Sequence, residues 1–178
     1  IKEQNNDFDK IYRILNAIGV IYEREGFPDK SLEYYNRALK INTENNDKTG
    51  IYRTNIGIGI LYISTKEYEK AFVFLKKALD VSEEINDLDM VAVCLNYLGS
   101  IHLSQKKPEL AFECYKRSES ISLKIGNQSA LSKAYRGLAS IYKDEKKYKK
   151  ALSSDDKQVE IKKAANGKHY LQKGKHTV

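Results

Sequence analysis

The stretch that decides the fold is residues 11–41, IYRILNAIGVIYEREGFPDKSLEYYNRALKI. In its first half, apolar residues recur every three or four positions, at Ile11, Leu15, Ile18, Ile21 and Tyr22. This spacing is typical of one face of an α-helix. Gly26 suits the end of that helix, and Pro28 suits the first turn of the next one. A second apolar series then follows at Leu32, Tyr35, Ala38, Leu39 and Ile41. The stretch therefore predicts two helices joined by a short turn.

The same pattern returns with a period of 40 residues through most of the chain. A small residue recurs at Gly19, Gly59, Gly99 and Ala139, and three positions later stand Tyr22, Tyr62, His102 and Tyr142. Polar breaks recur at Asn45-Asn46-Asp47, Ile85-Asn86-Asp87, Ile125-Gly126-Asn127 and Ala164-Ala165-Asn166-Gly167. Repeats in register without insertions indicate a stacked helical array. We therefore expect an all-α fold, an α-solenoid of antiparallel helix pairs.

The period also sets the expected domain organisation. The repeats cover residues 8–47, 48–87, 88–127 and 128–167, and a basic tail covers 168–178. The sequence of residues 1–7 resembles that of residues 41–47. We therefore expect residues 1–7 to be the last turn of a preceding second helix in a longer protein. In repeat four, Asp155 stands where the other repeats have Tyr or Leu. Its second helix is expected to be a solvent-facing cap or less well ordered, and the tail a natural ending, a linker or added sequence.

The small residues predict a close helix crossing. Glycine inside a helix costs about 1 kcal/mol relative to alanine, so three glycines at one register indicate that a side chain there would hold two helices apart. We expect Tyr22, Tyr62 and Tyr142 to fill the space beside this position. His102 replaces the tyrosine in repeat three, and we expect it to be a buried structural residue.

These residues resemble the tetratricopeptide repeat. Repeat two reads Ile58-Gly59-x-x-Tyr62 and then Ala71-x-x-x-Leu75-x-x-Ala78; repeat three reads Leu98-Gly99-x-x-His102 and then Ala111-x-x-x-Tyr115-x-x-Ser118. The period is 40 rather than the usual 34, which resembles the repeats of bacterial peptide-sensing regulators and of kinesin-light-chain-like scaffolds. The resemblance implies a right-handed superhelix that binds a protein or peptide, as the sensor or interaction region of a longer regulatory protein.

The resemblance also implies that the first helices line a concave groove. By register it nominates Arg13, Asn16, Arg53, Ile56, Ile60, Val93, Asn96, Lys133 and Arg136. Asparagine can donate to and accept from a peptide backbone, and arginine can bind a carboxylate through two hydrogen bonds. A groove with basic ends and an apolar middle suits an extended or helical peptide of acidic character. The alternative is that these residues face solvent or stack on the next repeat.

Other functional classes have little support in the sequence. The three histidines form no metal-ligand cluster, no nucleotide-binding glycine motif is present, and we expect neither an enzyme nor a cofactor. No run of about 18 apolar residues is present, so we expect no membrane span. We also expect a cytoplasmic protein. The net charge is +7, but residues 143–178 hold 11 Lys and 5 acidic residues, a net of +6, and no Arg. Nucleic-acid binding is therefore disfavoured, while self-association through an exposed helix face at either end stays open.

Overall fold

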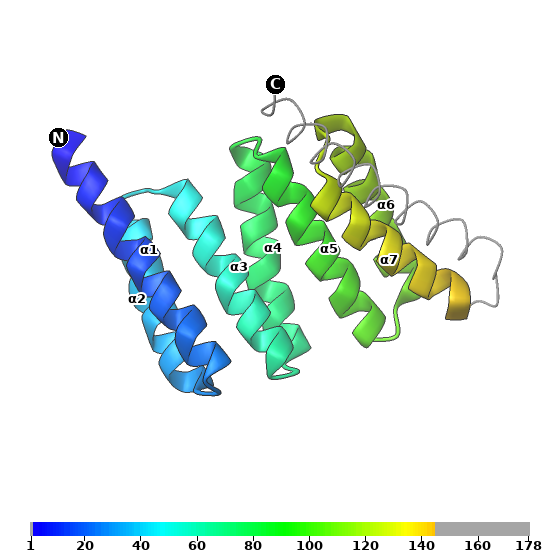
Figure 1. Ribbon diagram of the computed structural model, residues 1–178, viewed down its shortest axis with the longest axis horizontal. Coiled ribbons are helices and arrows are strands. Elements are labelled where there is room, and N and C mark those ends of the chain that lie inside the picture. Colours follow the sequence, from blue (N-terminus) through cyan, green and yellow to red (C-terminus); the bar gives the residue numbers. More distant parts are fainter. Residues whose placement is uncertain (1, 145–178) are drawn as a thin grey trace, which may run out of the picture. The chain divides into compact units, whose positions relative to one another are not determined.

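The structure is a computed structural model that describes the backbone of residues 2–144 and the side chains of residues 10–143. This part of the chain consists of α-helices joined by short turns, without a strand (Figure 1). The helices are α1 (Lys2–Arg24), α2 (Pro28–Glu44), α3 (Lys48–Ser64), α4 (Tyr68–Glu84), α5 (Leu88–Ser104), α6 (Pro108–Ile125) and α7 (Gln128–Asp144). The second helix expected in repeat four, with Asp155, and the basic tail lie outside the described residues.

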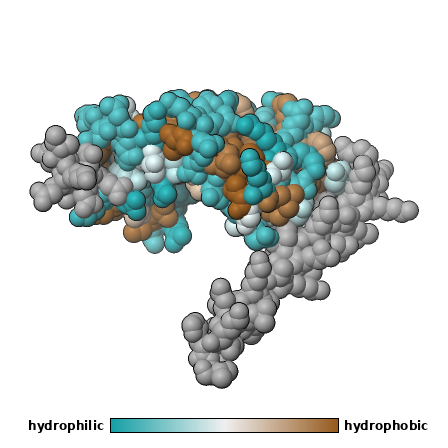
Figure 2. Space-filling model, turned by 90° about the horizontal axis from the view of Figure 1, so that it is seen from above, coloured by the Kyte–Doolittle hydropathy of each residue, from teal (hydrophilic) through white to brown (hydrophobic). Residues whose placement is uncertain are grey.

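The chain divides into two compact units, Ile1–Cys94 and Leu95–Val178, and α5 runs across the division. Within the first unit, α1 packs against α2, α2 against α3, and α3 against α4 (Figure 1). Within the second unit, α6 packs against α7. The expected all-α fold of consecutive helix pairs is therefore confirmed. On the face drawn in Figure 2, hydrophilic residues cover most of the surface and hydrophobic residues form separate patches.

The turns between helices share one backbone device. A residue with positive φ, between 52° and 79°, recurs every 20 positions, at Gly26, Asn46, Lys66, Asn86, Lys106 and Gly126. This left-handed conformation ends a helix and satisfies its last carbonyl groups. The next helix then begins with a side-chain cap at three of these breaks. Asp47 accepts a hydrogen bond from the Gly50 N–H at 3.0 Å, and Asn127 accepts one from the Ala130 N–H at 2.9 Å. The polar breaks seen in the sequence are thus helix stops followed by helix starts.

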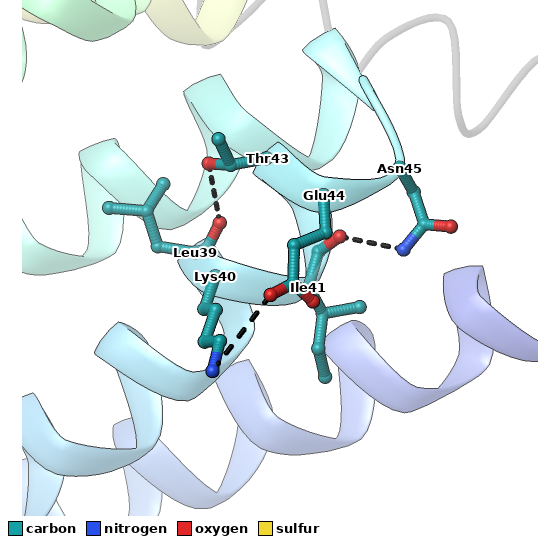
Figure 3. Close-up of polar contacts among 6 residues, drawn as sticks. All are labelled: Leu39, Lys40, Ile41, Thr43, Glu44 and Asn45. Atoms are coloured by element: carbon teal, nitrogen blue, oxygen red, sulfur yellow. Dashed lines mark hydrogen bonds and ion pairs between the residues drawn. The ribbon is translucent and has the colours of Figure 1, made fainter.

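The end of α2 shows how one break is built (Figure 3). The Thr43 hydroxyl donates to the Leu39 carbonyl at 2.8 Å, and the Asn45 side-chain amide donates to the Ile41 carbonyl at 2.8 Å. Lys40 and Glu44 form an exposed ion pair at 3.9 Å, a kind of pair that contributes little to stability. Side chains close to the helix end therefore add hydrogen bonds to carbonyl groups of its last turns, and the Ile41 carbonyl also accepts from the Asn45 backbone N–H at 3.1 Å.

One expected boundary is not found. Residues 1–7 were expected to end a separate helix, but the structure has one continuous helix from Lys2 to Arg24, without a break at Asn5-Asn6-Asp7. The equivalent break at residues 45–47 forms where α3 packs back on α2.

At Gly19, Gly59 and Gly99 the small position of the first helix meets the second helix, as expected. A Cβ added to Gly19 would lie 2.9 Å from Tyr35 Cε1, and one added to Gly59 would lie 2.6 Å from Leu75 Cγ. The side chains nearest to these two positions are therefore those of the second helix rather than Tyr22 and Tyr62, while the second helix expected beside Ala139 lies outside the described residues. A residue three positions later lies about 60° around the helix, which turns its side chain away from that contact.

Tyr22, Tyr62 and Tyr142 each meet an aromatic residue of a neighbouring helix, which belongs to the same repeat for Tyr22 and Tyr62 and to the preceding repeat for Tyr142. Tyr22 stacks on Tyr34 with ring centroids 5.4 Å apart, and Tyr62 stacks on Phe74 at 5.6 Å. Tyr142 meets Phe112 edge to face at 6.2 Å. His102 is half-buried rather than buried, and burial lowers its pKa, with Lys107 nearby acting in the same direction. Ala139 is buried, 2% exposed.

The turn at Lys66 offers a test of this backbone device. Lys66 has φ of 64°, a conformation that costs a residue with a side chain about 1–2 kcal/mol and costs glycine little. Glycine also makes the unfolded chain more flexible, which offsets part of the gain. We expect Lys66→Gly to raise the free energy of unfolding by about 0.5–1 kcal/mol in urea denaturation. Lys66→Ala is the control, since it removes the lysine side chain but keeps the Cβ; an equal gain for both variants would contradict the explanation.

Candidate binding site

A pocket of about 450 Å³ lies in the second unit, between the facing surfaces of α5 and α7. Its lining comes from α5, α7 and one residue of α6: Asn96, Tyr97, Ser100, Leu103, Tyr115, Lys133, Arg136, Gly137 and Ser140. The volume falls within the range of small-ligand and peptide side-chain sites. We call it the α5–α7 pocket.

The floor of the pocket is the ring of Tyr115, which lies between two glycines. A Cβ added to Gly99 would lie 2.8 Å from Tyr115 Cε1, and one added to Gly137 would lie 2.3 Å from Tyr115 Cζ. At these two glycines, the backbones of α5 and α7 both lie close to the ring, with no side chain between. Burial raises the pKa of Tyr115 to about 12, with the neighbouring Cys114 adding to the rise and a hydrogen bond with Ser100 opposing it. The floor is thus an uncharged phenol at neutral pH.

Asn96 lines this pocket and carries an acceptor without a described partner. Its side chain is only 6% exposed, and its Nδ2 donates to the Ala130 carbonyl at 2.9 Å. This bond fixes the orientation of the amide. Its Oδ1 is buried without a hydrogen-bond partner among the described residues. Because a buried acceptor without a partner costs about 1–3 kcal/mol, a ligand N–H that reached Oδ1 would recover that cost.

The rim of the pocket is basic and polar. The Lys133 ammonium lies 5.4 Å from the centroid of the Tyr97 ring, a cation–π contact that holds the lysine over α5. Arg136, one turn further along α7, is exposed. Ser100 and Ser140 are exposed as well, and Leu103 is half-buried. The pocket therefore combines a partly apolar floor, one buried acceptor and two exposed cations at its rim.

The structure brings three of the nine nominated residues together in the α5–α7 pocket: Asn96, Lys133 and Arg136. The other six lie in the first unit. Arg13 and Arg53 are exposed there, and the Arg53 guanidinium lies 5.9 Å from the centroid of the Tyr52 ring. Ile56, Ile60 and Val93 are half-buried on α3 and α5. A ligand-binding role for these six stays a prediction.

Asn16, also in the first unit, is engaged in a structural network. The Thr54 Oγ1 lies 3.0 Å from Asn16 Nδ2, 3.2 Å from Asn16 Oδ1 and 3.1 Å from Asn42 Nδ2. Thr54 is fully buried and Asn42 is 1% exposed. The network joins α1, α2 and α3 through one hydroxyl. A ligand that bound Asn16 through its amide would have to compete with this bond.

The lining residues Tyr97, Tyr115 and Gly137 were not anticipated from the sequence. A signal for the last two was present, since Tyr115 and Gly137 stand 22 positions apart, as do Tyr35 and Gly57. In both pairs the structure places the glycine against the tyrosine ring. At the same two registers the intervening repeat has Leu75 and Tyr97, which reverses the order of large and small residues. This alternation of large and small residues at the two registers is the sequence signal that would have predicted the contact between Tyr115 and Gly137.

The described residues contain neither a membrane-spanning helix nor a metal-ligand cluster. None of the helices in this part of the chain is both long enough and apolar enough to cross a membrane. Between residues 10 and 143, no three His, Cys, Asp or Glu side chains gather in a way that could hold a metal ion. Cys94 is buried and Cys114 is half-buried, and both are free thiols.

Comparison with known proteins places the chain among helical repeats. The profile of the family described as Tetratricopeptide repeat matches residues 10–84 and again residues 50–124. A search of curated proteins found no significant match.

Several solved structures have the same fold. BtubC (BKLC) from P. vanneervenii superposes with a TM-score of 0.79 at 24% identity, over 90% of this chain and 66% of its own. Aspartyl phosphate phosphatase F from Bacillus subtilis superposes with a TM-score of 0.83 at 20% identity, over 93% of this chain and 43% of its own. A Rap protein solved with competence and sporulation factor gives 0.80 at 22% identity, over 94% and 46%. The chain thus spans less than half of the last two proteins.

Proposed function

The chain belongs to the tetratricopeptide repeat family, and we propose that it binds a peptide or a peptide segment of a partner protein in the α5–α7 pocket. The observation that carries this proposal is the buried Asn96 Oδ1, which has no described hydrogen-bond partner and lines a pocket with a basic rim. The chain then acts as a scaffold rather than as a catalyst.

The lining residues suggest how a peptide would be held. A ligand backbone N–H donates to Asn96 Oδ1, while an apolar side chain rests on the ring of Tyr115 and on Leu103. A carboxylate of the ligand lies between Lys133 and Arg136 at the rim, where a charge-assisted hydrogen bond to arginine is strongest. The favoured ligand is therefore a peptide with an acidic residue close to an apolar one.

Two comparisons support an interaction role. The Rap protein of similar fold was solved in complex with competence and sporulation factor. A second similar structure, of which this chain covers 24%, is a signal transduction ATPase from Pyrococcus horikoshii with a tetratricopeptide repeat sensor. We propose that this chain is likewise the interaction region of a longer cytoplasmic regulatory protein.

Binding of short peptides to single-residue variants tests the proposal. The probes are hexapeptides that pair one Glu with one Leu or Phe, and the same hexapeptides with Gln in place of Glu. We expect the acidic set to bind more tightly, and Lys133→Ala and Arg136→Ala each to weaken it about tenfold in isothermal titration calorimetry, because each removes one charged contact. The Gln set is expected to be insensitive to both variants.

The matched control is Lys124→Ala, which removes an exposed cation from α6 outside the pocket. It is expected to leave peptide affinity unchanged. Equal losses for Lys124→Ala and Arg136→Ala would mean that the peptides respond to overall charge, and would contradict the site. Asn96→Leu probes the buried acceptor, with thermal unfolding measured alongside; unchanged affinity for both peptide sets in a folded Asn96→Leu protein would exclude the backbone contact.

A further inference from the structure

The framework of the α5–α7 pocket occurs a second time, in the first unit. Each residue that lines the pocket has a counterpart 80 positions earlier, on α1, α2 or α3. The ring of Tyr35 takes the place of Tyr115 and lies between two glycines. A Cβ added to Gly19 would lie 2.9 Å from Tyr35 Cε1, and one added to Gly57 would lie 2.8 Å from the same atom. Since α1 also contacts α3, the first unit holds the same framework.

The side chains around Tyr35 differ in chemistry from those around Tyr115. Val20, Glu23 and Ile56 stand where the pocket has Ser100, Leu103 and Arg136. All three exchanged residues are half-buried, and Val20 packs against the core cluster to which Tyr35 belongs. An apolar position of the pocket is thus acidic in the first unit, and a cationic position is apolar. We call Val20, Glu23 and Tyr35 the Tyr35 site.

The Tyr35 hydroxyl is a buried polar group without a hydrogen-bond partner. Tyr35 is 1% exposed, and no described group lies in hydrogen-bonding geometry within 3.5 Å of its oxygen. In the second unit Ser100 forms a hydrogen bond with the equivalent Tyr115, whereas Val20 has no polar side-chain group. Burial raises the pKa of Tyr35, and the nearby Glu23 carboxylate raises it further. A ligand group that reached this hydroxyl would recover the cost of leaving it unpaired.

Glu23 adds a carboxylate that forms no ion pair with another described residue. It is half-buried in the last turn of α1, where the negative end of the helix dipole disfavours a carboxylate. Burial raises the pKa of Glu23, and its interactions with the Tyr35 hydroxyl and with Arg24 oppose the rise. A cation supplied by a ligand would stabilise this carboxylate in its charged form.

From these contacts we infer that the Tyr35 site binds a lysine side chain of a peptide. The ammonium group donates to the Glu23 carboxylate and to the Tyr35 hydroxyl, while the alkyl stem lies along Val20. Lysine fits better than arginine because an ammonium is compact and carries three donors, whereas a guanidinium is broad and planar. The inference rests on the proposed function only for the class of ligand, a peptide. The two units then select side chains of opposite charge.

Two capped hexapeptides test the Tyr35 site. One holds a single Lys among Ala and Leu, and the other has norleucine in place of Lys, which keeps the alkyl stem and removes the charge. With the full chain in isothermal titration calorimetry, we expect the lysine peptide to bind about tenfold more tightly. Glu23→Gln is expected to abolish this difference without lowering the thermal unfolding temperature, since it keeps the shape of the side chain. Tyr35→Phe, which keeps the ring between the two glycines, is expected to weaken the lysine peptide about threefold.

Glu25→Gln is the matched control, because it removes an exposed carboxylate two residues further along, outside the site. It is expected to leave the affinity for the lysine peptide unchanged. The inference is overturned if the lysine and norleucine peptides bind equally, or if Glu23→Gln and Glu25→Gln weaken the lysine peptide to the same extent. An unchanged affinity in folded Tyr35→Phe would overturn it as well.

Crossed variants separate the Tyr35 site from the α5–α7 pocket. Glu23→Gln is expected to leave binding of the acidic hexapeptides unchanged, and Lys133→Ala to leave binding of the lysine peptide unchanged. If only the lysine peptide binds and needs Glu23, the α5–α7 pocket is contradicted and the Tyr35 site is supported; if only the acidic set binds and needs Lys133, the reverse holds. A gain in affinity for the lysine peptide when the lysines of residues 145–178 are replaced with glutamine would also overturn the inference, because the chain's own lysines would then occupy the site.

Discussion

Replacing Gly137 with alanine is expected to lower the free energy of unfolding by about 2–3 kcal/mol. The added Cβ would lie 2.3 Å from Tyr115 Cζ, and the ring has no room to retreat because Gly99 lies against its Cε1 atom. The clash pushes α6 and α7 apart or forces the ring out of its rotamer. Urea denaturation followed by circular dichroism measures the loss.

A second substitution, which makes the facing side chain smaller, is expected to restore the stability of this variant. Tyr115→Leu in the Gly137→Ala background is expected to recover most of the lost stability, since leucine stands at this register in repeat two. Ser140→Ala, one turn further on α7 and exposed, is the control and is expected to change stability by less than about 0.5 kcal/mol. If the double variant is less stable than Gly137→Ala alone, the steric explanation fails.

Thr54→Val is expected to destabilise the first unit by about 2–4 kcal/mol. Valine keeps the volume of threonine but removes the hydroxyl that lies 3.0 Å from Asn16 Nδ2 and 3.1 Å from Asn42 Nδ2. Two amide groups then lose a hydrogen-bond partner, and at the Asn42 amide, which is 1% exposed, water cannot replace it. Thermal unfolding of the variant, together with hydrogen exchange of the α1 and α3 amides, measures the effect.

Thr54→Ser provides the matched control, because it keeps the hydroxyl and loses only a methyl group. It is expected to cost about 1 kcal/mol, the value of one buried methyl group. Equal losses for serine and valine would mean that packing, rather than the hydroxyl, holds the three helices together at this point.

The sequence predicted the fold well because each of its signals is local. The small residue at Gly19 and Gly59 marks a close helix crossing. Asp47 caps a helix by accepting a hydrogen bond from the backbone N–H of Gly50, three residues later. The exception was the break at residues 5–7, where the same three residues continue a helix. A turn of this kind also needs a helix to pack against, and no sequence motif contains that contact.

The binding site was predicted only in part, for a related reason. Register placed Asn96, Lys133 and Arg136 on α5 and α7, because the position of a residue around a helix follows from counting. Counting could not show that the Asn16 amide lies within hydrogen-bond distance of Thr54, 38 positions away. It could not show either that Tyr115 of the second helix forms the pocket floor. Both depend on which side chains meet across helices that are distant in the sequence.

The matching of Tyr35 with Gly57 and of Tyr115 with Gly137 bears on how an array of this kind can change length. Removing residues 48–87 would join equivalent turns cleanly, yet it would bring Tyr97 to the register of Gly57, opposite Tyr35. Removing residues 48–127 would bring Gly137 there instead and preserve the match. The match between tyrosine and glycine therefore recurs every two repeats, or 80 residues, although the helical pattern repeats every 40. Gains and losses of single repeats require a compensating substitution, whereas those of two repeats do not.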